Sequence, residues 1–355
     1  MTQKLRLIAV AAAFAAASGA AEAATVRFDR MMVLGDSLSD VGNAHELSLG
    51  LAPESPPYDR LRFSNGKIWY DHVAAVIEEA GGRARNYAYG GAHAIGDRDQ
   101  IPDLQDQRRR MVDNVTPRDG DLAAIWIGGN DLLERVGRDN MRNVARNAAD
   151  QVFDAARALQ RNGFDTAMIF NMPNLADIPR YAGASAADRN SARGGSRAYN
   201  ERLDARIDQL RGRGMQVIEV DVYGLFADVV ANPGSYGIEN LTTPCIRGGR
   251  DRCSGAEARV TAFADDIHPS AALHRILADH VLGLLAPETL AGLLDGAAAT
   301  APAARAPSAE VAAVPAPAPG LLLVAGLGVL GAAARRRAAG RARGHPFPFA
   351  PEAAM

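Results

Sequence analysis

A serine, a histidine and an aspartate stand in short stretches of this sequence where they could support nucleophilic catalysis. Ser37 lies in GDSLSD, and His268 lies in DDIHP, three residues after Asp265. A serine hydroxyl is a weak nucleophile, so it needs a base within hydrogen-bond reach. Histidine suits that task because its pKa is near neutrality, and a carboxylate can orient the ring and stabilise the imidazolium. Ser37, His268 and Asp265 could therefore act as nucleophile, base and orienting group.

The same chemistry needs donors for the oxyanion that develops at an attacked carbonyl group. The Gly90–Gly91 pair could supply a backbone N–H, because glycine lets a substrate approach the main chain closely. Asn130 in GGND could supply a side-chain amide. Each stretch alone is weak evidence, since turns and helix caps use the same residue types. The sequence contains no HExxH, GxSxG or P-loop pattern that would point to other chemistry.

Apolar runs that alternate with helical patterns predict the elements that must position these residues. Strands are expected in RFDRMMVLGDS, ARNYAYGG, DLAAIWIGGND, TAMIFNMPNL and MQVIEVDVYGLF. Helices are expected in GKIWYDHVAAVIEEAGG, at Met141–Asn162, around Leu203–Leu210 and after Ser270. This alternation predicts an α/β fold, a three-layer α/β/α sandwich with a central five-stranded parallel sheet. Ligands bind such sheets beyond the carboxyl ends of the strands, where the candidate residues are expected to meet.

Taken together, these stretches resemble the conserved blocks of the SGNH, or GDSL-type, family of lipases and esterases. The resemblance covers about Phe28 to Leu285. It rests on GDSLSDVGN at Gly35–Asn43, NYAYGGA at Asn86–Ala92, GGND at Gly128–Asp131 and DDIHP at Asp265–Pro269. It implies a flavodoxin-like hydrolase domain, which we expect to span residues 25–288.

The resemblance also implies an activity and a role for each candidate residue. The activity is carboxylic ester hydrolysis on a lipid or small acyl ester, with no cofactor and no metal. Ser37 is implied as nucleophile, His268 as base and Asp265, chosen over Asp266 on family spacing, as the orienting carboxylate. The implied oxyanion hole consists of the N–H groups of Ser37 and Gly91 and the amide of Asn130. An acyltransferase with the same site and a non-catalytic surface protein are the alternatives.

Composition narrows the class of protein. The chain has 355 residues, 48% of them hydrophobic, and a formal net charge of −2. A single large core is expected, and there is no charge-based reason to expect a nucleic-acid partner. Two cysteines, Cys245 and Cys253, are expected to form a disulfide in an exported chain; two unpaired thiols are the alternative. Two thiols alone do not supply the four ligands of a structural metal site.

The N-terminal residues have the pattern of a secretory signal peptide. Lys4 and Arg6 precede a short apolar run, and AEA at Ala21–Ala23 offers small residues for cleavage. We therefore expect residues 1–23 to be a signal peptide and the protein to be periplasmic, secreted or on the cell surface. An N-terminal membrane anchor is the alternative.

The C-terminal part of the chain changes composition after the expected domain. Residues 289–319 are expected to form an Ala/Pro-rich linker, and residues 338–355 a disordered tail. Between them, residues 320–337 combine an apolar run with an arginine cluster. This region resembles a PEP-CTERM sorting signal, with VPAP at Val314–Pro317, and implies an exosortase partner. A simple membrane anchor and an unstructured tail are the alternatives.

Overall fold

The computed structural model describes residues 28–96 and 99–286 of the chain. Segments that the sequence assigns to export, linkage and sorting lie outside these residues and remain predictions: 1–23, 289–319, 320–337 and 338–355. Within the described residues, none of the helices is both long enough and apolar enough to span a membrane.

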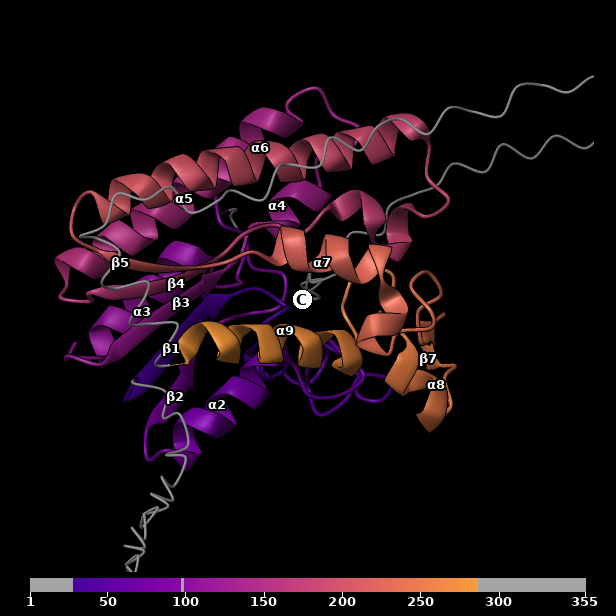
Figure 1. Cartoon of the computed structure of the whole chain (residues 1–355), viewed down its shortest axis with the longest axis horizontal. Helices are drawn as coiled ribbons and strands as arrows, with labels where there is room; N and C mark the ends of the chain where they lie inside the picture. The colour runs from indigo at the N-terminus through magenta and orange to yellow at the C-terminus, as the bar shows by residue number, and fades with distance from the viewer. Residues whose placement is uncertain (1–27, 97–98, 287–355) are drawn as a thin grey trace, which may run out of the picture. The chain divides into compact units, whose positions relative to one another are not determined.

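A five-stranded parallel sheet in the order β2-β1-β3-β4-β5 forms the centre of the domain (Figure 1). Its strands are β1 at Arg30–Gly35, β2 at Arg83–Asn86, β3 at Asp121–Trp126, β4 at Thr166–Phe170 and β5 at Gln216–Val220. The strands β3 and β4 are buried along their whole length. Sheets covered on both faces show such continuous apolar strands.

Helices cover both faces of this sheet, which confirms the predicted α/β/α sandwich (Figure 1). One layer contains α3 at Leu104–Asn114, α5 at Met141–Arg161 and α6 at Ala186–Arg211, and the other contains α2 at Trp69–Glu79 and α9 at Ala271–Leu285. Along β1, Met31 and Val33 pack in the second layer, while Met32 and Leu34 pack in the first. This alternation is the two-residue period of a strand.

Several elements differ from those expected along the sequence. The second strand ends at Asn86 instead of running to Gly91, because the Asn86 side chain accepts the Ala88 N–H at 2.9 Å and turns the chain. The fifth apolar run is divided into β5 and α7, Val222–Ala231, because the Asp221 carboxylate caps the helix by accepting the Gly224 N–H.

One helix is longer than its sequence pattern predicted, and another was not predicted. The helix α6 begins at Ala186, well before the expected Leu203–Leu210 core, because Ser185 caps it by accepting the Asp188 N–H. The early turns of α6 carry few apolar side chains. The helix α3 was not expected, since its sequence LQDQRRRMVDN is mostly polar.

Short elements complete the described part of the domain. They are α1 at Asn43–Leu47, α4 at Gly129–Leu133, α8 at Gly255–Val260, β6 at Ile246–Arg247, β7 at Arg250–Asp251 and the 3₁₀ helices at Leu175–Asp177, Pro179–Tyr181 and Pro233–Tyr236.

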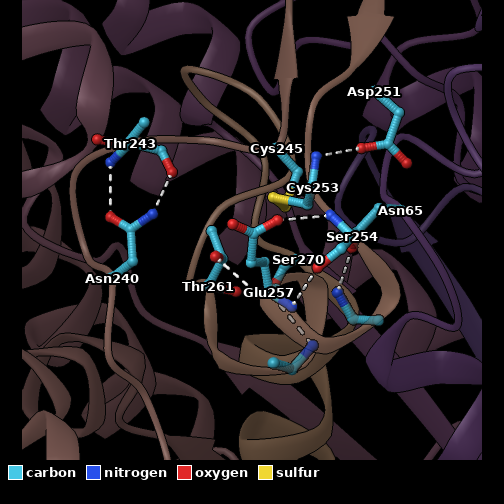
Figure 2. The surroundings of a disulfide bond; sticks show 12 residues. Asn65, Asn240, Thr243, Cys245, Asp251, Cys253, Ser254, Glu257, Thr261 and Ser270 are labelled. Carbon is cyan, nitrogen blue, oxygen red and sulfur yellow. Dashed lines mark hydrogen bonds between the residues drawn. A yellow bond between two sulfur atoms is a disulfide. The ribbon is translucent and has the colours of Figure 1, made fainter.

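The β6–β7 hairpin is closed by a disulfide between Cys245 and Cys253 (Figure 2). The hairpin also holds the chain that leads to Asp265. The backbone N–H of Cys245 donates to the Phe263 carbonyl at 3.2 Å, and that of Ile246 donates to the Ala264 carbonyl at 2.6 Å. The disulfide therefore braces a strand-like segment immediately before a candidate catalytic residue.

Replacing both cysteines by serine should lower the thermal stability of the domain. The cysteines are separated by 8 positions. Without the disulfide the unfolded chain gains conformational entropy, which lowers the free energy of unfolding by about 2.5 kcal/mol for a loop of this length. Circular dichroism should show a melting temperature lower by roughly 5–10 °C. A reductant should destabilise the parent protein and leave the double variant unchanged. Equal melting temperatures for the parent with and without reductant would contradict this account.

Candidate active site

The candidate residues gather at the carboxyl edge of the sheet. Ser37 is the second residue after β1, and Asn130 lies in α4, which follows β3. Gly91 lies in the loop after β2, and the segment from Asp265 to His268 lies in the loop before α9. The parallel sheet brings these loops to one edge, as the sequence analysis expected.

Ser37, His268 and Asp265 are joined by hydrogen bonds. His268 Nε2 lies 2.8 Å from Ser37 Oγ, and His268 Nδ1 lies 2.7 Å from Asp265 Oδ2. The other oxygen of Asp265 accepts the backbone N–H groups of Ile267 and His268 at 2.8 and 2.7 Å. These contacts fix the carboxylate against the imidazole ring. The arrangement can take a proton from the serine hydroxyl and stabilise the resulting imidazolium.

The neighbouring Asp266 does not occupy this position. Its carboxylate accepts a hydrogen bond from the Arg180 guanidinium at 2.8 Å and is exposed. The structure therefore pairs His268 with Asp265 of the two adjacent aspartates.

Burial and charge act in opposite directions on this pair. Burial alone would raise the pKa of Asp265, but the His268 ring and hydrogen bonds from His268 and Tyr58 hold the pKa of Asp265 well below its usual range. Burial alone would lower the pKa of His268, but the Asp265 carboxylate raises it above its ordinary value. The pair thus favours an ionised carboxylate beside a basic imidazole.

Tyr58 is a member of this network that the sequence analysis did not single out. Its hydroxyl donates a hydrogen bond to Asp265 Oδ2 at 2.5 Å. This oxygen therefore accepts hydrogen bonds from both Tyr58 and His268. The Phe63 ring lies beside this contact, with its centroid 5.4 Å from that of the His268 ring. Tyr58 belongs to a proline-rich loop without periodic pattern, and Asp265 follows it by 207 positions. Local sequence therefore carries no signal for this contact.

Two of the three candidate oxyanion donors, Gly91 and Asn130, lie on adjoining segments, the first in a loop and the second in α4. The Asn130 side-chain amide donates to the Ala92 carbonyl at 2.9 Å, next to Gly91. Gly91 adopts a positive φ of 87°, and a Cβ atom there would come within 2.8 Å of Ile101. Only glycine fits this backbone without strain. The roles of Ser37, Gly91 and Asn130 at an oxyanion remain a prediction.

Buried carboxylates hold the loops that carry these donors. Asp40 accepts four backbone N–H groups, and the bond from Gly90 at 2.7 Å joins the Ser37 loop to the glycine pair. Asp131 accepts the N–H groups of Ala94 and Ile95 at 2.8 and 3.0 Å. These bonds satisfy donors that the irregular backbone leaves unpaired.

The polar helix α3 also contributes to the placement of Ser37. The buried side chain of Gln107 accepts the Gly35 N–H and donates to the Gly35 carbonyl, both at 2.8 Å. Gly35 lies against β3 so closely that a Cβ atom would be 2.7 Å from the Trp126 carbonyl oxygen. The end of β1 is thereby fixed two residues before the serine.

An apolar cavity opens beside Ser37. Its empty volume is about 860 Å³, including open solvent. Apolar side chains from α7, α9, the loop after β4 and the loop before α9 line it, among them Met172, Leu225, Phe226, Ile267, Leu273 and Leu277. His274 also lines the cavity; burial lowers its pKa to about 3, so its ring is neutral. Such a cavity suits an uncharged, apolar part of a ligand.

Residues 31–281 match the model of the family described as GDSL-like Lipase/Acylhydrolase. The chain belongs to this family. The family assignment made from the sequence is thus confirmed, and this GDSL-like protein is a serine ester hydrolase. The resemblance to a sorting signal lies outside the matched and the described residues.

Two relatives and one solved structure illustrate the similarity of this GDSL-like hydrolase to known proteins. It is 26% identical over 279 residues to the phosphatidylcholine-sterol acyltransferase of Aeromonas hydrophila, covering 75% of this chain and 82% of the relative. It is 23% identical to the thermolabile hemolysin of Vibrio parahaemolyticus, covering 72% and 63%. A lipolytic G-D-S-L family protein from Veillonella parvula aligns with a TM-score of 0.44 and 16% identity, covering 72% and 97%.

Replacing Tyr58 by phenylalanine should raise the pKa of His268 by roughly half to one unit. The Tyr58 hydroxyl proton partly offsets the Asp265 charge, so its loss leaves a carboxylate that stabilises the imidazolium more strongly. Titration of ¹⁵N-labelled histidine by NMR measures this pKa. Tyr70→Phe is the matched control, since Tyr70 is buried, whereas Tyr58 is half-buried, and the side chains that bond Asp265 Oδ2 are those of Tyr58 and His268. A His268 pKa that stays constant or falls in Tyr58→Phe would contradict the assignment.

Proposed function

We propose that this GDSL-like hydrolase cleaves acyl esters by a Ser-His-Asp mechanism through an acyl-enzyme. The observation that carries the proposal is the continuous set of hydrogen bonds from Ser37 Oγ through His268 to Asp265. Ser37 Oγ attacks the acyl carbon while His268 Nε2 takes its proton. The carbonyl electron pair moves to oxygen, and Asp265 stabilises the imidazolium. His268 then gives the proton to the leaving alcohol as the ester bond breaks.

The oxyanion would be bound by the N–H groups of Ser37 and Gly91 and by the Asn130 amide. An amide nitrogen carries two hydrogens, so Asn130 can keep its bond to the Ala92 carbonyl and donate the second hydrogen to the oxyanion. Water then attacks the acyl-enzyme as His268 takes its proton. His268 returns that proton to Ser37 Oγ as the bond between the acyl carbon and Oγ breaks, and the carboxylic acid leaves. Loss of one oxyanion donor typically lowers the rate about 10²–10³-fold.

The substrate's acyl part is proposed to be an apolar chain longer than acetyl. Most of the side chains that line the cavity beside Ser37 are apolar, and they come from α7, α9 and the loops around them. Each methylene buried there would contribute about 0.8 kcal/mol. Transfer of the acyl group to an alcohol instead of water is the second candidate. It is supported by the similarity to the Aeromonas hydrophila relative, which is an acyltransferase.

The protein is proposed to act outside the cytoplasm. Support comes from the signal-peptide pattern at residues 1–23 and from the Cys245–Cys253 disulfide, since such bonds persist in oxidising compartments. The segment 320–337 would add retention at a membrane or sorting by an exosortase.

Substituting Ser37 by alanine should abolish ester hydrolysis. Without the hydroxyl no acyl-enzyme forms, and kcat should fall at least about 10³-fold. Initial rates on p-nitrophenyl esters measure the effect, with Ser185→Ala as the control because Ser185 only caps α6. Alanine at position 37 with full activity would refute the mechanism. Product analysis in water–alcohol mixtures separates hydrolysis from acyl transfer.

A chain-length series should reveal the acyl preference. We expect kcat/KM to increase from acetyl to medium-chain p-nitrophenyl esters, since the longer chains bury more apolar surface in the cavity. Leu225→Trp reduces the cavity and should shift the preference toward shorter chains. Leu284 also belongs to α9 but is not among the residues that line the cavity, so Leu284→Trp should leave the preference unchanged. A preference for acetyl esters in the parent would contradict the proposed acyl site.

A further inference from the structure

A second hollow lies between α5 and α6, the two long helices at the top of Figure 1. None of the residues that line it also lines the cavity beside Ser37. Its walls carry Arg142 and Arg146 from α5 and Arg193 and Arg197 from α6. Gly194 lines it too and lacks a side chain that would fill it; a Cβ atom there would lie 3.9 Å from Arg142 Nε. We call this hollow the arginine groove.

The positive charge of the arginine groove is not balanced by the described residues around it. The guanidinium groups of Arg142, Arg146 and Arg197 form no hydrogen bond or ion pair with any described residue. The Arg193 guanidinium donates to the neutral amide oxygen of Asn190 at 3.2 Å. Glu201 is the one acidic side chain among the described residues that line the groove, and it forms no ion pair within 4 Å. Four guanidinium groups thus face one carboxylate.

In the next turns of the same two helices, a carboxylate from α5 lies between arginines of α6. Asp150 follows Arg146 by one turn of α5, and its carboxylate accepts Arg202 at 2.7 and 2.9 Å and Arg206 at 2.6 Å. Both arginines belong to α6. In the arginine groove, α5 carries Arg142 and Arg146 where an aspartate would be needed to bind the arginines of α6. An anion held there would complete the pattern that Asp150 makes.

The spacing of the arginines also places like charges next to each other on each helix. Arg142 and Arg146 are four residues apart on one helix, as are Arg193 and Arg197 on the other. Like charges at this spacing repel each other and destabilise a helix. A bound anion would remove that repulsion, so ligand binding and stability should be coupled.

We propose that the arginine groove binds a phosphate group. The planar guanidinium fork offers paired N–H donors that match phosphate oxygens, and several such groups on facing helices can hold one polyanion. The groove is open to solvent, so the phosphate can belong either to a soluble phosphate ester or to the headgroup of an anionic phospholipid. The site does not involve Ser37 or His268, so it is independent of the proposed ester hydrolysis.

The test uses the full processed chain and two probes. Titration calorimetry measures the affinity for inorganic pyrophosphate at constant ionic strength, and vesicle sedimentation compares phosphatidylcholine with and without phosphatidylglycerol. The groove variant is Arg146→Gln with Arg197→Gln. The matched control is Arg83→Gln with Arg85→Gln, which removes the same charge from two exposed side chains of β2. Hydrolysis of a soluble ester should be equal in all three proteins.

The groove variant should bind at least one probe about tenfold or more weakly than the parent and the control. Loss of pyrophosphate binding supports the site with a soluble phosphate as its ligand, and loss of binding to phosphatidylglycerol vesicles alone supports the site with a lipid headgroup. Equal binding by groove variant and control, or binding of neither probe by the parent, would overturn the proposal. Ser37→Ala should bind as the parent does, which separates this outcome from failure of the proposed mechanism.

Discussion

The hydrogen bond between Ser37 Oγ and His268 Nε2 is the contact on which the rest of the site depends. It joins residues 231 positions apart, at a distance of 2.8 Å. Such precision requires both loops to be fixed independently. The end of β1 is held by Gln107 and by close packing against β3, while His268 is held by Asp265 and by the segment that the disulfide hairpin braces. A parallel sheet, with loops at one edge, makes that convergence feasible.

Buried charge is the second constraint on this edge of the domain. The carboxylates of Asp40, Asp131 and Asp265 are each taken out of water, and each is compensated by backbone N–H groups or by a polar side chain. Asp36 has less compensation, so burial raises its pKa to about 7. These carboxylates hold irregular backbone segments that glycine residues would otherwise leave flexible. The polar network is therefore maintained by its own hydrogen bonds, although an apolar cavity lies beside Ser37.

Much of this arrangement could be predicted from the sequence because its determinants are local. β1, β3 and β4 consist mainly of apolar residues, and Ser37 and Asn130 lie shortly after the ends of β1 and β3. Other features depend on contacts between distant segments. Tyr58 reaches Asp265 across 207 positions, and the cavity needs the split of one apolar run into β5 and α7. Neither the polar helix α3 nor the early turns of α6 show the apolar periodicity that reveals a helix.

The central claim is that the environment of Ser37 makes its hydroxyl a nucleophile. Peptide mass spectrometry after brief exposure to a fluorophosphonate tests this most directly, because the reagent marks activated serines covalently. We predict a single adduct on the peptide that contains Ser37, formed rapidly in the parent protein and far more slowly in Asp265→Asn. An adduct on a different serine, or no adduct in a correctly folded parent, would contradict the account.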